Sequence, residues 1–401
     1  MTWSTVRLGS VVETLVPQRD KPDPLTGEIP WVRIEDFSGR DLSESKSGQG
    51  VTAEQVRTMN LRVFPPGTVL CSCSCSMGAT AIATAPLVSN QTFIGLVPRR
   101  DMDSRFLFYL MGSMREELQS QATGAIQQYL SRDDFRSLRV PLPPIGEQRR
   151  IADFLDAETG RIDKVRVARG RMHELLRLKR EGVIEHFLGN EERSVDLVPL
   201  KHLVEAVTVG IVVTPAAWYV DSGGVPALRG VNIKPGRIDA KDLVRISQEG
   251  HLVHHKSRLR SGDLVVVRTG QAGAAAVVTP DFDGANCVDL VIVRPGPSLI
   301  PRFAEYLLNS SYARRRVAEF AVGSIQSHFN VAAMKAMPVP RHSPMDQHRI
   351  VDEIDKATEP IDTAVSLMRR QDHLLAERRQ ALITAAIAGH IDVTTARGAD
   401  V

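Results

Sequence analysis

The feature that most constrains this chain is a repeat that divides its 401 residues into two similar halves. Gln148 and Gln347 lie 199 positions apart, within the related stretches Gly-Glu-Gln-Arg-Arg-Ile and Met-Asp-Gln-His-Arg-Ile. The same spacing separates Ile162 from Ile361. Two copies of one sequence unit are expected to fold in the same way, so the repeat predicts two matching structural units.

The repeat extends toward the beginning of each half, where the spacing shrinks as small insertions would cause. Gly67 matches Gly262 at a spacing of 195, and Val97 is matched to Val293 at 196. The other matched pairs are Gly78 with Gly273, Pro30 with Pro226 and Arg33 with Arg229. A series that keeps one order along the chain is not expected by chance, so the whole chain is interpreted as two copies of one unit.

Each copy divides into a mixed α/β part and a long helix. Short apolar stretches such as 67–70 and 263–267, bounded by Gly and Pro, are typical of strands. Residues 104–119 and 302–320 have the three-and-four spacing of helices. The predicted fold class is α+β, with two mixed α/β domains, two long helices and a pseudo-two-fold internal repeat. The predicted boundaries are 1–140 for the first domain, 141–194 for the first spacer helix, 195–337 for the second domain, 338–394 for the second spacer helix and 395–401 for a disordered tail.

The two predicted spacer helices have the alternating apolar steps of coiled coils. Gly189 and Gly389 mark their expected ends, and Pro360 predicts a kink or break in the second helix. About forty residues give a rod of roughly 60 Å, longer than the ~34 Å of one B-DNA turn, so the two domains are predicted to contact a ligand at two separated places. The apolar seams are Ile151, Leu155, Ile162, Val165, Met172, Leu176, Val183 and Phe187, and Ile350, Ile354, Ile361, Ala364, Met368, Leu375, Leu382 and Ala386.

Composition is that of a soluble globular protein, with 43% hydrophobic and 24% charged residues. No apolar run approaches the length of a membrane span, and the N-terminus lacks the pattern of an export signal, so a cytoplasmic location is predicted. The net charge of +3 permits nucleic-acid binding without indicating it. Cys71, Cys73 and Cys75 alternate, which favours buried thiols over a zinc site, and no metal is predicted.

Motifs of catalysis are missing from the sequence. It contains no Asn-Pro-Pro-aromatic motif of an amino-methyltransferase, no Gly-x-x-x-x-Gly-Lys-Ser/Thr phosphate loop and no Gly-x-Ser-x-Gly elbow. We therefore predict no catalytic residue in this chain.

The order of motifs resembles that of the DNA-specificity subunits of type I restriction–modification enzymes. The stretches 124–131 and 140–151 resemble the junction at which a target-recognition domain of that family runs through a Pro-rich turn into a spacer helix. Residues 323–326, 337–340 and 347–350 look like the same junction, and 262–273 is similar to a Gly-rich loop of these domains. The resemblance covers essentially the whole chain.

This resemblance implies a non-catalytic, DNA-binding subunit whose two domains each read one half of a bipartite, asymmetric target. It implies that the two helices pack antiparallel and dock two adenine-N6 methyltransferase subunits, which carry out DNA methylation. Restriction and translocase subunits would join this assembly. S-adenosylmethionine, Mg²⁺ and ATP would belong to those partners, and no cofactor to this chain. The residues of the helices and of this docking surface would be Glu147, Gln148, Ile151, Ile162, Met172, Leu176, Gln347, Ile350, Ile361, Met368, Leu375 and Leu382.

The candidate DNA-binding residues lie on Gly-flanked loops. Arg268, Thr269 and Gln271 could make paired hydrogen bonds to base edges, or could contact phosphate or solvent. Arg33 and Arg229 follow predicted strands, where a surface ion pair and a phosphate contact are both open. The polar residues after the repeated glycines, which suit either a DNA-facing loop or a helix cap, are Gln127, Gln128, Ser131, Arg132, Gln326, Ser327, His328 and Asn330, and the first Gly-rich loop adds Ser74 and Ser76.

Two differences between the copies bear on this interpretation. The first Gly-rich loop reads Cys-Ser-Cys-Ser-Cys-Ser-Met-Gly where the second has Arg-Thr-Gly-Gln, so the two domains are expected to read different half-sites. The junction 341–346 lacks the Pro-Ile-Gly-Glu of 144–147, so docking at the two ends may differ in detail. The alternative function is a coiled-coil interaction scaffold that does not bind DNA, for which the Gly-rich loops and junctions would be unnecessary.

Overall fold

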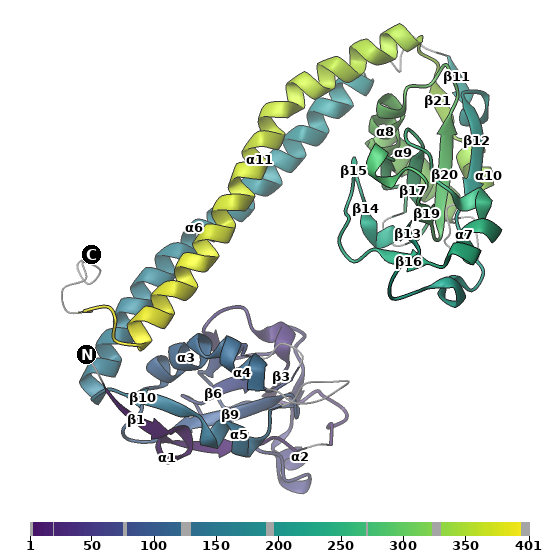
Figure 1. Ribbon diagram of the computed structural model, residues 1–401. Coiled ribbons are helices and arrows are strands. Elements are labelled where there is room, and N and C mark those ends of the chain that lie inside the picture. The colour runs from purple at the N-terminus through teal and green to yellow at the C-terminus, as the bar shows by residue number, and fades with distance from the viewer. Residues whose placement is uncertain are drawn as a thin grey trace. The chain divides into compact units, whose positions relative to one another are not determined.

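The computed structural model describes residues 3–18, 20–74, 78–121, 130–189, 196–269, 272–322 and 330–393. The chain forms two compact units (Figure 1). Unit 1 contains Met1–Gly170 and Arg369–Val401, and unit 2 contains Arg171–Met368. Each unit therefore includes one globular domain and parts of both long helices. We call the globular residues 3–143 domain 1 and 196–343 domain 2. The predicted tail 395–401 lies outside the described residues.

Domain 1 is built on a five-stranded sheet with the order β2-β9-β6-β7-β4, in which only β4 and β7 are parallel. A three-stranded sheet β5-β3-β8 and the pair β1-β10 complete it. The strands are β1 Ser4–Arg7, β2 Val12–Leu15, β3 Ile29–Val32, β4 Asp41–Leu42, β5 Gly50–Val51, β6 Val69–Ser72, β7 Thr80–Ala83, β8 Val88–Ser89, β9 Phe93–Pro98 and β10 Arg139–Leu142. The helices are α1 Leu8–Val11, η1 Ile34–Asp36, α2 Ala53–Thr58, α3 Ser104–Ser113, α4 Arg115–Gln121 and α5 Arg132–Ser137.

Domain 2 repeats this plan with an antiparallel four-stranded sheet in the order β12-β20-β17-β18. A three-stranded sheet β16-β13-β19 and the pairs β14-β15 and β11-β21 accompany it. The strands are β11 Leu197–Pro199, β12 Val204–Val209, β13 Val225–Leu228, β14 Ile233–Lys234, β15 Arg237–Ile238, β16 Val244–Ile246, β17 Leu264–Val267, β18 Ala275–Val277, β19 Asn286–Cys287, β20 Leu290–Pro295 and β21 Pro338–Pro340. The helices are η2 Leu200–His202, η3 Pro215–Trp218, η4 Gly230–Asn232, α7 Gln248–Val253, η5 His255–Ser257, η6 Pro280–Phe282, α8 Pro301–Asn309, α9 Ser311–Val322 and α10 Val331–Ala336.

The backbone confirms the predicted repeat at its glycines. Gly67 and Gly262 have φ angles of +88° and +89°, and Gly78 and Gly273 have +79° and +90°. These left-handed conformations favour glycine because a side chain would clash with its own backbone there. The strand–turn–strand segments β6–β7 and β17–β18 are therefore equivalent turns, related by the spacing of 195.

One predicted match in the repeat is wrong by a residue. Val69 pairs with Leu96 in the first sheet, and Leu264 pairs with Val293 in the second. Leu96, and not Val97, is therefore the counterpart of Val293, at a spacing of 197. A shift of one residue places a strand side chain on the opposite face of the sheet, so the error would have exchanged core and surface positions.

The free edges of the two main sheets are completed differently. In domain 1, β4 pairs with β7, and the Ile82 N–H donates to the Arg40 carbonyl at 2.7 Å. In domain 2, the Gly236 N–H donates to the Ala275 carbonyl at 2.9 Å, and side chains of α8 bind this edge as well. The Asn309 amide accepts from Ala275 N–H at 3.0 Å and donates to the Ala275 carbonyl at 2.8 Å, while Glu305 accepts from Val277 N–H at 2.8 Å.

The two spacer helices are α6, Ile145–Gly189, and α11, Pro344–Ile387. Gly189 closes α6 as predicted, and Gly389, with φ +74°, follows the end of α11. The break considered at Pro360 is wrong, because α11 runs through it. Thr358 and Ile361, on either side of Pro360, are both buried, so packing holds the helix through the residue that lacks an N–H.

Each unit shows how the helices pair. In unit 1, the start of α6 (Ile151) shares a core with the end of α11 (Ile383 and Ile387). In unit 2, the start of α11 (Ile350) shares a core with the end of α6 (Ile184). The beginning of each helix therefore packs against the end of the other, which is the antiparallel arrangement predicted.

The predicted apolar seam is wrong in the middle of α6. The Val165 and Met172 side chains are 47% and 49% exposed. The positions nearby are held by charged pairs within each unit: in unit 1, Arg169 Nε lies 2.5 Å from the Asp372 carboxylate. Symmetry-related ion pairs, Asp163–Arg379 in unit 1 and Asp362–Arg180 in unit 2, are 199 positions apart in both members.

Candidate nucleic-acid interface and its attachment to the helices

Arg268 lies in domain 2, directly after β17, where the Gly-rich loop begins. Its Nη1 donates to Asp289 Oδ1 at 2.6 Å, and Thr269 Oγ1 lies 3.4 Å from the other oxygen of the same carboxylate. The Arg268 side chain is 18% exposed. The Arg268 guanidinium is thus oriented by a carboxylate at the start of the loop, and base reading stays a prediction for this residue. Gln271 lies outside the described residues.

Arg229 comes to the same edge from β13. Gly230, the next residue, lies beside Val267, the residue before Arg268, because a Cβ on Gly230 would be in ordinary contact with Val267 at 3.6 Å. The Arg229 N–H is held by Asn232 at 3.0 Å, and its guanidinium donates to the Asp242 carbonyl at 2.9 Å. The structure thus places Arg229 beside the Gly-rich loop.

Domain 1 has the equivalent turn with different contacts. The Arg33 N–H donates to Asp36 at 2.7 Å, matching Arg229 with Asn232, but the Arg33 guanidinium pairs with Glu35 at 3.2 Å and with Gln49. The surface ion pair considered for Arg33 is therefore present. Its counterpart Arg229 instead binds a backbone carbonyl.

Ser74 is the described member of the first Gly-rich loop, and it is buried. Its Oγ has no hydrogen-bond partner in the described part of the chain. Beside it, Cys73 N–H donates to the Thr92 carbonyl at 2.9 Å and its carbonyl accepts from Leu130 N–H at 3.0 Å. The turn Asn90-Gln91-Thr92 therefore borders the loop, with Gln91 exposed. These three polar residues were missed from the sequence, although they lie between two apolar strands. Ser76 lies outside the described residues.

Two residues after the repeated glycines are helix caps. The Ser131 hydroxyl accepts from Asp134 N–H at 3.2 Å at the start of α5, and Asn330 Oδ1 accepts from Ala333 N–H at 2.9 Å at the start of α10. Capping thus accounts for both side chains, while Arg132 is exposed. The candidates Gln127, Gln128, Gln326, Ser327 and His328 lie outside the described residues.

The cysteines are buried, as predicted for those that are described. Cys71, Cys73 and Cys287 are free thiols, and burial raises the pKa of Cys71 and Cys287. Within the described residues, no group of His, Cys, Asp and Glu is arranged to hold a metal ion. Cys75 lies outside them.

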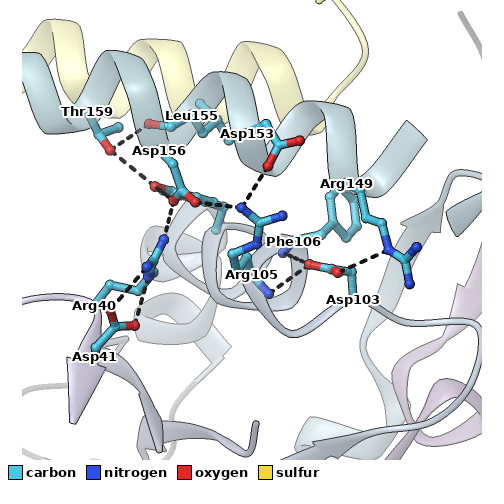
Figure 2. A network of polar contacts seen from close by, with 11 residues as sticks. Arg40, Asp41, Asp103, Arg105, Phe106, Arg149, Asp153, Leu155, Asp156 and Thr159 are labelled. Carbon is cyan, nitrogen blue, oxygen red and sulfur yellow. Dashed lines mark hydrogen bonds and ion pairs between the residues drawn. The ribbon is translucent and has the colours of Figure 1, made fainter. Parts of the chain in front are cut away.

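A network of polar contacts joins domain 1 to α6, and Figure 2 shows its members around Asp156. Asp156 accepts from Tyr109 at 2.7 Å and from Arg105 at 2.9 Å, and it contacts Arg40 at 2.6 Å. Arg105 also pairs with Asp153 at 2.7 Å. We call this set of contacts the Asp156 clamp.

Domain 2 has an equivalent, the Asp355 clamp, on α11. Arg302 donates to Asp355 at 3.0 Å and to the Tyr306 hydroxyl at 2.8 Å, and Tyr306 in turn donates to the same carboxylate. Burial raises the pKa of Tyr306 to about 12, so its hydroxyl is protonated and donates at neutral pH. Arg105 and Tyr109 precede Arg302 and Tyr306 by 197 positions, and Asp156 precedes Asp355 by 199. Sequence reasoning missed both clamps.

Gln148 and Gln347 fasten the same junctions from inside. Gln148 is fully buried, donates to the Asp101 and Pro143 carbonyls at 2.8 Å each and accepts from Asp103 N–H at 2.9 Å. Gln347 repeats this with Ser298, His342 and Ile300. Each glutamine therefore ties the turn before a long helix to a loop of the globular domain. That loop precedes α3 in domain 1 and α8 in domain 2.

The other candidate spacer residues differ in exposure. Glu147 pairs with Arg150 one turn along α6. Ile151, Ile162, Ile350 and Ile361 are buried. The remaining candidates, which are partly exposed, are Leu176, Met368, Leu375 and Leu382.

Removing the carboxylate of the Asp156 clamp is expected to loosen domain 1 from α6. Asp156→Ala leaves two arginines and a tyrosine without their shared acceptor and is expected to lower the free energy of unfolding by about 2 kcal/mol. Asp153→Ala is the matched control, because that side chain is 66% exposed and serves one arginine, so the expected loss is at most about 0.5 kcal/mol. Urea unfolding of both variants measures the difference, and equal losses would contradict a special role for Asp156.

Comparison with known proteins shows what the chain is similar to. The family model described as "Type I restriction modification DNA specificity domain" matches residues 1–164. The MjaVIII specificity subunit of Methanocaldococcus jannaschii is 22% identical over 98% of this chain and 93% of its own length. The chain is thus similar to type I restriction enzyme specificity subunits over nearly its whole length.

A further specificity subunit and a solved structure agree with this. The MjaIX subunit of M. jannaschii is 29% identical, but the match spans 37% of this chain and only 35% of that relative. A chain solved in work on complex assembly and conformational transition of the type I R-M system shares the fold, with a TM-score of 0.63 at 19% identity, over 97% of this chain and 98% of its own.

The resemblance to type I specificity subunits, seen first in the sequence, is thereby confirmed. No helix within the described residues is both long and apolar enough to cross a bilayer.

Proposed function

We propose that this chain is a specificity subunit that reads a bipartite, asymmetric duplex, one half with each domain. The observation that carries the proposal is that equivalent edges of a repeated domain bear different side chains. Domain 2 presents Arg268, Thr269 and Asp289, whereas domain 1 presents the turn from Asn90 to Thr92 beside the buried Ser74. Equivalent placement suits two reading surfaces, and different hydrogen-bonding groups suit two different half-sites.

The proposal extends to partners. Two adenine-N6 methyltransferase subunits would dock on the paired helices and act on an adenine in each half-site, which must leave the base stack to be modified. Restriction and translocase subunits would join this assembly. S-adenosylmethionine, Mg²⁺ and ATP would be bound by those partners, which supply the chemistry that this chain is not expected to perform.

The test is to express the chain, together with a type I adenine methyltransferase subunit from the same genome, in a host that lacks adenine methylation. Methylation-aware sequencing is expected to show one split motif with modified adenine in both parts. Omitting this chain should abolish the motif. If methylation is absent or unsplit and the complex binds duplex DNA without sequence preference, the chain is better explained as an interaction scaffold.

Arg268 offers a sharper test of domain 2. Arg268→Ala is expected to weaken binding to the target by about 1–3 kcal/mol, roughly fivefold to 150-fold, and to relax the preference for one base in one half-site. Arg132→Ala, an exposed arginine of domain 1, is the control for loss of one positive charge. Fluorescence anisotropy is measured on the target and on a duplex with that base changed. Loss of a phosphate contact weakens binding to both duplexes equally, whereas loss of a base contact weakens binding to the target alone.

A further inference from the structure

The two clamps that attach the domains to the helices differ in one ligand. In unit 1, Asp156 is contacted by Arg105, Tyr109 and also Arg40. In unit 2, the described residues supply Asp355 with Arg302 and Tyr306, and with no third cation. The Asp355 side chain is accordingly 44% exposed, against 24% for Asp156.

The charge around the second clamp is also more negative. Glu305 stands where domain 1 has Phe108, and Arg302 divides its contacts between Glu305 and Asp355. Asp352, the counterpart of Asp153, is exposed and has no ion pair within the described residues, whereas Asp153 is paired with Arg105. In unit 2 one arginine pairs with two carboxylates, whereas in unit 1 two arginines share three, Asp41, Asp153 and Asp156.

A groove opens on α11 beside Asp355, where the described residues of unit 2 supply no counterpart of Arg40. It has a volume of about 730 Å³ and carries an additional carboxylate, Glu359, at the position that Gly160 occupies in the first copy. The matching hollow of unit 1 is smaller, about 500 Å³, and Arg40 lines it. Lys356 contributes the one lysine among the lining residues. The other principal residues of this α11 groove are Asp355, Thr358, Asp362, Thr363 and Leu367.

We propose that the α11 groove receives an arginine side chain of the methyltransferase subunit that docks on this part of the spacer, an inference that rests on the proposed function. Arg40 shows in the first copy which group fits: a guanidinium whose N–H groups reach the equivalent carboxylate. In the groove, such a group would face Asp355 and Glu359 and pack its methylenes on Leu367. In unit 1 the clamp carboxylate is then paired within this chain, by Arg40, and in unit 2 it would be paired by an arginine of the methyltransferase.

Arg237 is the competing occupant from this chain. It follows Gly236 on β15, where a Cβ on Gly236 would lie 4.0 Å from the Glu305 carboxylate. Arg237 itself is exposed and makes no ion pair with the described residues. The partner is favoured because Glu305 and Arg302 already occupy the space between this turn and Asp355.

The experiment uses the full chain and a type I adenine methyltransferase subunit from the same genome. Glu359→Lys places a positive charge in the groove without touching the contacts of the Asp355 clamp. Glu377→Lys makes the same change at a 60% exposed position of α11 outside the groove. Arg237→Ala tests the internal occupant. Native mass spectrometry counts the bound methyltransferases, titration calorimetry measures the affinity of each, and thermal unfolding verifies that each variant is folded.

The wild-type chain and Glu377→Lys are expected to hold two methyltransferases. Glu359→Lys should keep one with unchanged affinity and bind the second about tenfold more weakly. Two full-affinity sites in Glu359→Lys would overturn this inference alone, as would an equal loss in Arg237→Ala. A wild-type chain that binds no methyltransferase would overturn the proposed function and this inference with it.

Discussion

Replacing residues 3–142 with the corresponding domain of another type I specificity subunit is expected to change one half of the methylated motif and leave the other half intact. The reading edge of domain 1, from Ser74 to the turn at Asn90–Thr92, lies entirely within this segment. Each correct base pair contributes about 1–3 kcal/mol of discrimination, so affinity for the parent target is expected to fall about a thousandfold.

The strand pairing decides where this exchange is cut. β1 and β10 pair along their lengths, from Ser4 with Leu142 to Arg7 with Arg139. A boundary at 140 would leave half of β10 from the parent, whereas a boundary after 142 transfers the complete pair. The reciprocal exchange of 197–340 keeps β11 with β21 and serves as the control. Methylation-aware sequencing measures both, and a change in both halves from one exchange would refute modular reading.

Gln347→Ala is expected to lower the free energy of unfolding of unit 2 by about 3 kcal/mol. The substitution removes three hydrogen bonds at a site where the side chain is 1% exposed. It leaves the Ile300 N–H and the Ser298 and His342 carbonyls without their partner, and an unsatisfied buried polar group costs about 1–3 kcal/mol. Gln148→Ala should cost unit 1 a similar amount, because its contacts are equivalent.

Urea unfolding measures these losses, and Gln380→Ala is the matched control. Gln380 lies on the exposed side of α11 and makes a single hydrogen bond of 3.3 Å to the Gly112 carbonyl, so its loss is expected to stay within about 0.5 kcal/mol. A Gln347→Ala protein as stable as the control would show that water replaces all three hydrogen bonds. The junction would then be held by the apolar core around Ile350 alone.

The repeat and the long helices could be predicted from spacing because both are periodic properties of sequence. The middle of the helix pair could not be predicted in this way. Arg169 of α6 pairs with Asp372 of α11, and a heptad pattern of apolar residues gives no information on ion pairs between helices. The wrong match of Val97 with Val293 arose because insertions vary the spacing of the repeat between 195 and 199. Since successive strand residues point to opposite faces of the sheet, an error of one position exchanges those faces.

The interface was harder to predict than the fold. Ser131 and Asn330 have the same residue types in a cap as in a DNA-facing loop, and only the contacts distinguish them. The clamps escaped notice because their arginine and tyrosine repeat at 197 and their aspartate at 199, so no single offset aligns all three. Comparing Arg-x-x-x-Tyr in 105–109 and 302–306 would have revealed them.

The side chains that finish the sheet of domain 2 have a consequence for solubility. A bare β18 would present N–H and C=O groups to a strand of another molecule, which is how sheets join and aggregate. The Asn309 amide occupies the groups of Ala275 as a neighbouring strand would. Together with the Gly236 N–H, which donates to the Ala275 carbonyl at 2.9 Å, this amide covers the edge of β18 at which a second molecule could otherwise add a strand.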